Sequence, residues 1–181
     1  MDPADVSRFF EGLDGGARVE AVRELNRREQ AALFDAVEGF HSIGLDDVVP
    51  PSVAPLTEVI HYGRNSLPAM NRFEKRFCRP PDGTGELWGY NEHANRWLTG
   101  PGYFVARPHG NGEVLIDYLV VPSAKPDGWP PIKPNSVGGS RFVYHRTQDI
   151  LRGVSRHVCV GRDTKDGKPK DIWFVLCRSE S

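Results

Sequence analysis

The sequence predicts an α+β fold, in which N-terminal helices precede a strongly curved antiparallel β-sheet or small β-barrel. Three observations lead to this prediction. Apolar residues recur at helical spacing over the first forty residues, a proline-rich stretch follows, and short runs of β-branched and aromatic residues then alternate with glycine and proline turns. The 181 residues, of which 39% are hydrophobic and 26% charged, suit one folded domain.

We therefore divide the single domain 1–181 into three parts. A helical segment covers 1–40, and an antiparallel β-rich body covers 57–178. Between them, residues 41–56 form a connector in which Pro50-Pro51 and Pro55 exclude a regular helix. We expect this connector to be ordered and to lie along the body.

Local signals divide the helical segment into separate helices. Asp14-Gly15-Gly16 ends the first helix. Asn26 stands three residues before Glu29, which is the spacing of a capping box and predicts the start of a further helix. Gly39 is a natural stop for that helix.

The body is expected to contain about seven or eight short strands, enough for a sheet to curl strongly or close. The segment from Glu113 to Val121 is the clearest strand, because β-branched and aromatic residues dominate it. We also expect a strand at 141–145, a helical turn at 147–153 and one helical turn at 66–70.

Residues 72–79 are compatible with a helix or a strand, because Phe73 and Phe77 share a face in either case. The turn and the strand that follow favour a hairpin. In a strand, Lys75 lies on the same face as the two phenylalanines. Basic and aromatic residues are interleaved here, as on a face that binds single-stranded nucleic acid.

The last two strands are expected at 155–162 and 171–178, joined through Lys165-Asp166-Gly167-Lys168. Asp-Gly between two apolar runs is a strong hairpin signal. Pairing of Lys165 with Lys168 places Cys159 opposite Phe174, and His157 opposite Leu176.

Charge and composition argue against several classes of protein. The formal net charge of −1 gives no global field that favours nucleic acid or an anionic membrane. The N-terminus lacks the basic start and apolar run of a secretory signal, and no apolar stretch approaches the roughly 20 residues that cross a bilayer. Three cysteines without a CxxC pair fit a reducing, cytoplasmic location.

The familiar motifs of catalysis and metal binding are absent. No histidine pair has HxxxH or HExxH spacing, no GxSxG elbow occurs, and Gly83-Thr84-Gly85 precedes a strand instead of opening a helix. We therefore expect no metal site, and the sequence identifies no cofactor. The loop from Pro122 to Gly139, which holds Trp129, is unusually long and is expected to cover something or bind something.

Polar residues inside apolar strands are the best site candidates. Asp117 shares a strand face with Leu115 and Leu119, where a carboxylate is costly unless it is paired. If such faces point inward, they place a carboxylate, two cations, an imidazole and tyrosine hydroxyls, including that of Tyr118, inside the barrel. The expected ligand-binding residues are Lys75, Trp88, Tyr90, Tyr103, Asp117, Arg156 and His157.

Three hypotheses about function follow. The leading one is a domain that binds a small molecule in a partly polar pocket inside the curved sheet, with the Trp129 loop as a lid. The second is an enzyme that uses the same cavity for general acid/base chemistry, with Asp117 or His157 as the base. The third is a protein-interaction module that docks a partner through the N-terminal helices or the 122–139 loop. The alternative to all three hypotheses is that Asp117 and one cation form only a structural ion pair, or that the charged faces are exposed to water.

Overall fold

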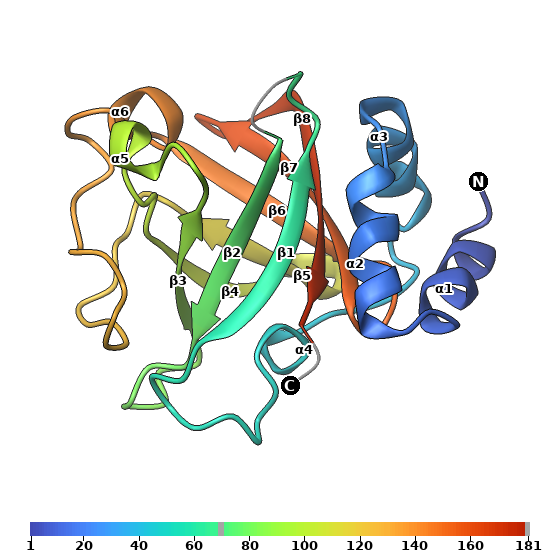
Figure 1. Ribbon diagram of the computed structural model, residues 1–181, viewed down its shortest axis with the longest axis horizontal. Helices are drawn as coiled ribbons and strands as arrows, with labels where there is room; N and C mark the ends of the chain where they lie inside the picture. Colours follow the sequence, from blue (N-terminus) through green and yellow to red (C-terminus); the bar gives the residue numbers. More distant parts are fainter. Residues whose placement is uncertain (69–70, 180–181) are drawn as a thin grey trace.

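A closed barrel of eight antiparallel strands dominates the computed structural model, which describes residues 1–68 and 71–179 (Figure 1). Each strand pairs with the next along the chain, and β1 closes the barrel by pairing with β8. The barrel form of the predicted fold is therefore confirmed. The strands are β1 Val59–Asn65, β2 Arg72–Cys78, β3 Leu87–Glu92, β4 Phe104–His109, β5 Glu113–Asp117, β6 Thr147–Gly153, β7 Val158–Lys165 and β8 Lys168–Arg178.

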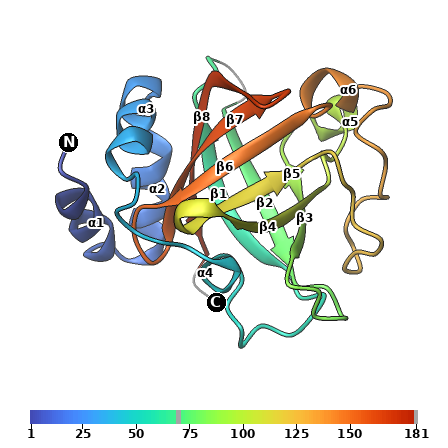
Figure 2. The ribbon, with the colours of Figure 1, turned by 180° about the vertical axis from the view of Figure 1, so that it is seen from behind.

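Three helices, α1 (Pro3–Glu11), α2 (Gly15–Glu24) and α3 (Arg27–Ala36), cover one side of the barrel (Figure 2). The capping box of Asn26 and Glu29 is present at the start of α3. The apolar faces of the helices pack with the outer faces of β7 and β8 in one buried cluster, which includes Phe10, Val22, Leu33, Phe34, Val160 and Val175. None of the helices in the described part has the length and apolar character needed to cross a membrane.

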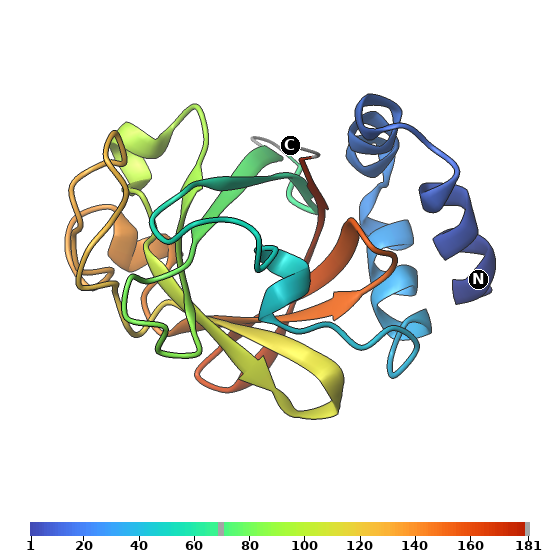
Figure 3. The ribbon, with the colours of Figure 1, turned by 90° about the horizontal axis from the view of Figure 1, so that it is seen from below.

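The connector closes one end of the barrel. It contains one short helix, α4 (Leu45–Val48), which ends before Pro50 and lies across that end (Figure 3). Val48 and Val49 join the same apolar cluster as the interior residue Phe77. Short helices α5 (Arg96–Thr99) and α6 (Ser140–Val143) flank the opposite end of the barrel.

The 122–139 loop packs against the outer wall of the barrel. Trp129 is buried there against Tyr90 and Tyr103, and its indole nitrogen donates to Glu58 Oε2 at 2.6 Å. Asn135 Nδ2 donates to the carbonyl oxygen of Tyr103 at 2.7 Å. This corrects the expectation of a lid, since Trp129 covers the outside of the sheet and leaves no exposed Trp129 surface for a partner.

Two neighbouring elements were predicted the wrong way round. The strand expected at 141–145 is helix α6, which covers 140–143, and the helical turn expected at 147–153 is strand β6. Burial alternates strictly along β6, but two of its inward residues, Thr147 and Asp149, are polar and conceal the pattern. The turn expected at 66–70 lies partly outside the described residues.

The ambiguous segment around Phe73 is strand β2, so the hairpin interpretation is confirmed. In the last hairpin Lys165 pairs with Lys168 as predicted, but a bulge between Arg162 and Thr164 shifts the register beyond it. Phe174 therefore lies opposite Gly161 instead of Cys159.

The bulge has a consequence for the interior. A Cβ atom on Gly161 would come within 2.1 Å of the ring of Phe174. Glycine at this position therefore leaves room for the phenyl ring. That ring lines the cavity at the open end of the barrel.

Candidate functional site

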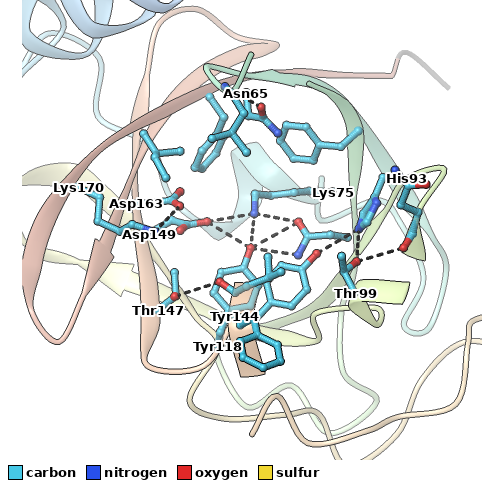
Figure 4. Close-up of a pocket in the computed structure, with 18 residues that line it drawn as sticks. Asn65, Lys75, His93, Thr99, Tyr118, Tyr144, Thr147, Asp149, Asp163 and Lys170 are labelled. Carbon is cyan, nitrogen blue, oxygen red and sulfur yellow. Dashed lines mark hydrogen bonds and ion pairs between the residues drawn. The ribbon is translucent and has the colours of Figure 1, made fainter. Parts of the chain in front are cut away.

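A cavity of about 320 Å³ lies at the end of the barrel opposite α4 (Figure 4). Its walls are mostly apolar and include Phe73, Ile172 and Phe174 from strands β2 and β8. Polar side chains gather at its inner end and on one side. They are Asn65, Lys75, Asn91, His93, Asn95, Thr99, Tyr118, Tyr144, Thr147, Asp149, Asp163 and Lys170.

Lys75 is the centre of the polar inner end. Its Nζ donates hydrogen bonds to Asp149 Oδ2 at 3.1 Å, to Asn91 Oδ1 at 3.1 Å and to the hydroxyl of Tyr118. An ammonium group has three hydrogens, so all of its donors are used within the protein. Lys75 therefore supplies charge to the cavity but has no free hydrogen for a ligand.

Aromatic rings surround the same ammonium group. Nζ lies 4.8 Å from the ring centroid of Phe174, 5.1 Å from that of Tyr118 and 5.2 Å from that of Phe104. Ring faces attract cations at these distances. The rings and the Asp149 carboxylate together compensate the lysine for its loss of water, since its side chain is only 3% exposed.

Tyr118 and Asn91 complete the network. The Tyr118 hydroxyl donates to Asp149 Oδ2 at 3.3 Å, and Asn91 Nδ2 donates to the carbonyl oxygen of Gly102 at 3.1 Å. Burial raises the pKa of Tyr118, and the charge of Asp149 raises it further. Tyr118 is therefore a neutral hydrogen-bond donor at neutral pH.

A second carboxyl group, Asp163, stands beside Asp149. The two residues are cross-strand partners on β6 and β7, and their side chains lie close together (Figure 4). Desolvation raises the pKa of Asp163 well above its usual range, and the adjacent Asp149 raises it further, whereas Lys75 and Lys170 lower it. Asp163 therefore keeps its proton to higher pH than an exposed aspartate does.

The remaining oxygen of Asp149 is unusual. Oδ1 is buried, and apart from the hydrogen bond that Asp149 shares with the Asp163 carboxyl it has no donor among the described residues. A buried carboxylate oxygen without a donor is costly. The proton of Asp163, or a donor on a bound molecule, would fill this position.

A separate polar cluster lies on the side of the cavity below α5. His93 Nε2 lies 3.1 Å from Thr99 Oγ1 and 3.2 Å from the hydroxyl of Tyr144. Burial lowers the pKa of His93 and raises that of Tyr144, so both are neutral at neutral pH. The Tyr144 ring stacks on Tyr118 with the ring centroids 5.3 Å apart, which connects this cluster to the inner network.

The structure brings only Lys75 of the seven predicted site residues to the cavity. Trp88, Tyr90 and Tyr103 are buried on the outer face of the barrel, in the cluster that Trp129 covers. Their expected position on the interior wall is therefore wrong. Strand β3 is buried on both faces, so burial along the sequence could not distinguish its two sides.

Asp117 also lies on the outer face, as the cross-strand partner of Val105. Its Oδ1 accepts from the backbone N–H of Leu119 at 2.9 Å, and its Oδ2 lies 3.5 Å from Arg107 Nη1. This corrects the expected inward position. The backbone N–H of Leu119 and the guanidinium group of Arg107 compensate the Asp117 carboxylate for its burial.

Arg156 and His157 precede β7 and lie in the turn at the closed end of the barrel. Arg156 is exposed, and His157 Nδ1 lies 3.3 Å from Arg178 Nη2. Neither lines the cavity. The strand was expected to start at residue 155, but β7 starts at Val158. Both residues therefore precede the sheet instead of lying in it.

Sequence reasoning missed the two aspartates that define the inner end. Asp149 lies in the segment predicted as a helical turn, and Asp163 lies just beyond the predicted end of its strand. The spacing of Asp149 two residues before Leu151, on the same strand face, was the one signal that could have identified the first. No comparable signal marks Asp163.

In the described part of the chain, no three histidine, cysteine, aspartate or glutamate side chains are grouped as metal ligands. A cavity with apolar walls, one compensated lysine and a pair of carboxyls is suited to hold a small molecule or to transfer a proton. Comparison of the chain with models of known protein families, with curated proteins and with solved structures finds no match.

Proposed function

We propose that the barrel binds a small organic molecule in the cavity at its open end. The observation that carries the proposal is the buried ion pair of Lys75 and Asp149 at the inner end of an otherwise apolar cavity. Such a pair seldom stabilises a fold more than well-packed apolar residues do. A role in recognition explains why charged groups occupy a place where leucine would pack.

The dimensions limit the ligand. A cavity of about 320 Å³ lies at the small end of the range for small-molecule sites. The apolar walls formed by Phe73, Ile172 and Phe174 favour a ligand with an apolar body. The acceptor oxygen Asp149 Oδ1 favours a polar group at the inner end of that body.

A cavity-blocking variant tests the proposal. Val143 lines the mouth of the cavity and is 43% exposed, so tryptophan at this position fills the entrance without entering the core. Val137 is 52% exposed and does not line the cavity, so Val137→Trp is the matched control. A library of small apolar molecules with one polar group is screened by thermal unfolding, and native mass spectrometry of fresh protein detects a retained ligand.

A ligand at about 100 times its Kd should stabilise the wild type by about 2.7 kcal/mol. For a chain of this size, that corresponds to an increase in Tm of about 5–10 °C. We expect the increase in wild type and Val137→Trp, and its loss in Val143→Trp. A wild type that no molecule stabilises, or equal stabilisation of both variants, would contradict the proposal.

The carboxyl pair favours a second function, general acid/base catalysis in the same cavity. Burial and the neighbouring Asp149 raise the pKa of Asp163, while Lys75 and Tyr118 hydrogen-bond to Asp149, and two carboxyls in unlike environments are typical of acid/base pairs. Incubation of each stabilising ligand with wild type and Asp149→Asn, followed by mass spectrometry, tests this. Turnover that Asp149→Asn abolishes supports catalysis, whereas unchanged ligands in both samples contradict it.

A further inference from the structure

The inner end of the cavity holds more carboxyl groups than available cations. Lys75 uses its three hydrogens on Asp149, Asn91 and Tyr118, so its hydrogen bonds compensate only one carboxylate. Among the described residues, Asp163 forms an ion pair only with Lys170, with Nζ 4.0 Å from Oδ2 and the lysine side chain 34% exposed, while Lys75 acts on it without a hydrogen bond. An ion pair at that distance and exposure is weak.

Asp149 adds a second buried acceptor. Its side chain is 3% exposed, and apart from the hydrogen bond that Asp149 shares with the Asp163 carboxyl, Oδ1 has no donor among the described residues. Oδ1 and the Asp163 carboxyl together form an acceptor site that lacks a cation.

We infer that the ligand of this cavity is a protonated amine with an apolar body, whose ammonium group binds between Asp149 and Asp163. The inference rests on the proposed function, because it names the class of ligand for the same cavity. An ammonium group supplies both the positive charge and the N–H donors that the two carboxyls lack.

The walls fit the rest of such a molecule. Phe73 and Phe174 lie edge to face with their centroids 6.1 Å apart, and both line the cavity next to the carboxyl pair. Aromatic faces attract an ammonium group and pack against an apolar body. An arylalkyl amine of about ten non-hydrogen atoms matches a cavity at the small end of the range for small-molecule sites.

Amine binding should release a proton. The charged or titratable groups that face Asp163 are Asp149 from β6, Lys170 from β8, Lys75 from β2, and the hydroxyls of Tyr118 and Tyr144. The raised pKa of Asp163 favours its protonated form in the free protein, whereas a bound ammonium group favours the ionised carboxylate. The proton that leaves Asp163 passes to the solvent, so amine affinity should increase with pH while the amine stays charged.

Three probes of one skeleton test the inference by isothermal titration calorimetry: 2-phenylethylamine, 2-phenylethanol and 3-phenylpropionate. We expect the amine to bind wild type tightest, by about tenfold or more over the alcohol. Its affinity should rise as the pH is raised above the ordinary aspartate range, because proton release accompanies binding. Titrations in phosphate and in Tris, which differ in ionisation enthalpy, count the released protons.

Two variants identify the carboxyl that responds. Asp163→Asn should lose the tenfold preference for the amine over the alcohol, and the proton release. Asp171→Asn makes the same substitution at a side chain that is 76% exposed, and it should behave as wild type. If Asp163→Asn does not fold, proton release by the wild type and its pH dependence remain decisive.

The outcomes separate this inference from the proposed function. Tighter binding of the alcohol or the carboxylate, or amine binding without proton release, overturns the amine inference and leaves the cavity a ligand site. Binding of none of the three probes overturns the amine inference as well. The cavity itself is contradicted only by the separate test with Val143→Trp and Val137→Trp.

Discussion

Lys75 and Asp149 come from strands β2 and β6, which do not pair, and meet inside the barrel with Nζ 3.1 Å from Oδ2. Each side chain is only 3% exposed. Their contact therefore ties opposite parts of the barrel wall together through a dehydrated ion pair. Its two members depend on each other, because either charge alone would be buried without compensation.

Replacement of Lys75 by methionine should destabilise the protein strongly. The variant keeps the apolar stem but leaves Asp149 buried next to Asp163 with no cation in contact. The loss of an ion-pair partner in such a place costs about 3–5 kcal/mol. Urea unfolding at neutral pH measures the free energy of unfolding.

Two controls define that result. Lys75→Met combined with Asp149→Leu removes both charges and should recover most of the lost stability. Arg8→Met breaks a surface pair with Asp5, whose side chains are 76% and 65% exposed, and should change stability by less than about 0.5 kcal/mol. Equal stability of Lys75→Met and wild type would show that the buried pair contributes nothing.

The sequence predicted the barrel well because its walls obey simple rules. The Asp-Gly turn fixed the last hairpin, and the β-branched run near Ile116 marked β5. The inward polar residues broke the same rules. Thr147 and Asp149 interrupt the apolar alternation of β6, so the strand that carries the site was predicted as a helical turn. Departures from local patterns are expected where residues serve a site.

The site was also hidden by topology. Lys75 and Asn91 are cross-strand partners on β2 and β3, but Asp149 lies on β6, and only closure of the barrel brings it to them. The strand faces of Asp117 and Tyr103 could not be assigned from sequence, because the Trp129 loop buries the outer face as thoroughly as the core buries the inner one. Polarity in an apolar strand therefore indicated burial, but not the side of the sheet.

His61 should make the protein sensitive to acid. It is 2% exposed, and burial lowers its pKa to about 4, with Arg178 lowering it further. Between pH values of about 4 and 6.5 the unfolded chain binds a proton that the folded protein does not. The free energy of unfolding should therefore rise with pH across this window, by about 3 kcal/mol.

Unfolding by urea at several pH values measures this contribution. His61→Gln should lose most of the rise, whereas His109→Gln, at an exposed position, should keep it. The prediction fails if the difference between wild type and His61→Gln does not change with pH.

Asp163 should act in the opposite direction. Its folded pKa is raised by burial and by Asp149, so the folded state binds more protons than the unfolded state above the ordinary aspartate range. Its contribution to stability is complete at low pH and is lost as pH rises through the folded value. Asp163→Asn should therefore gain Tm relative to wild type as the pH is raised. A pH-independent difference in Tm, measured by scanning calorimetry, would contradict the raised pKa.

The three cysteines should be inert in the folded protein. Cys78, Cys159 and Cys177 are all buried, and burial raises the pKa of Cys78 and of Cys159 to about 12. Thiol reagents attack the thiolate, which is scarce at mildly alkaline pH for such groups. Titration with Ellman's reagent should detect no fast-reacting thiol in native protein and all three in guanidinium. Phe142→Cys places a thiol at a position that is 77% exposed and should add one fast equivalent. Rapid reaction of the wild type would show that the barrel wall opens on the time scale of labelling.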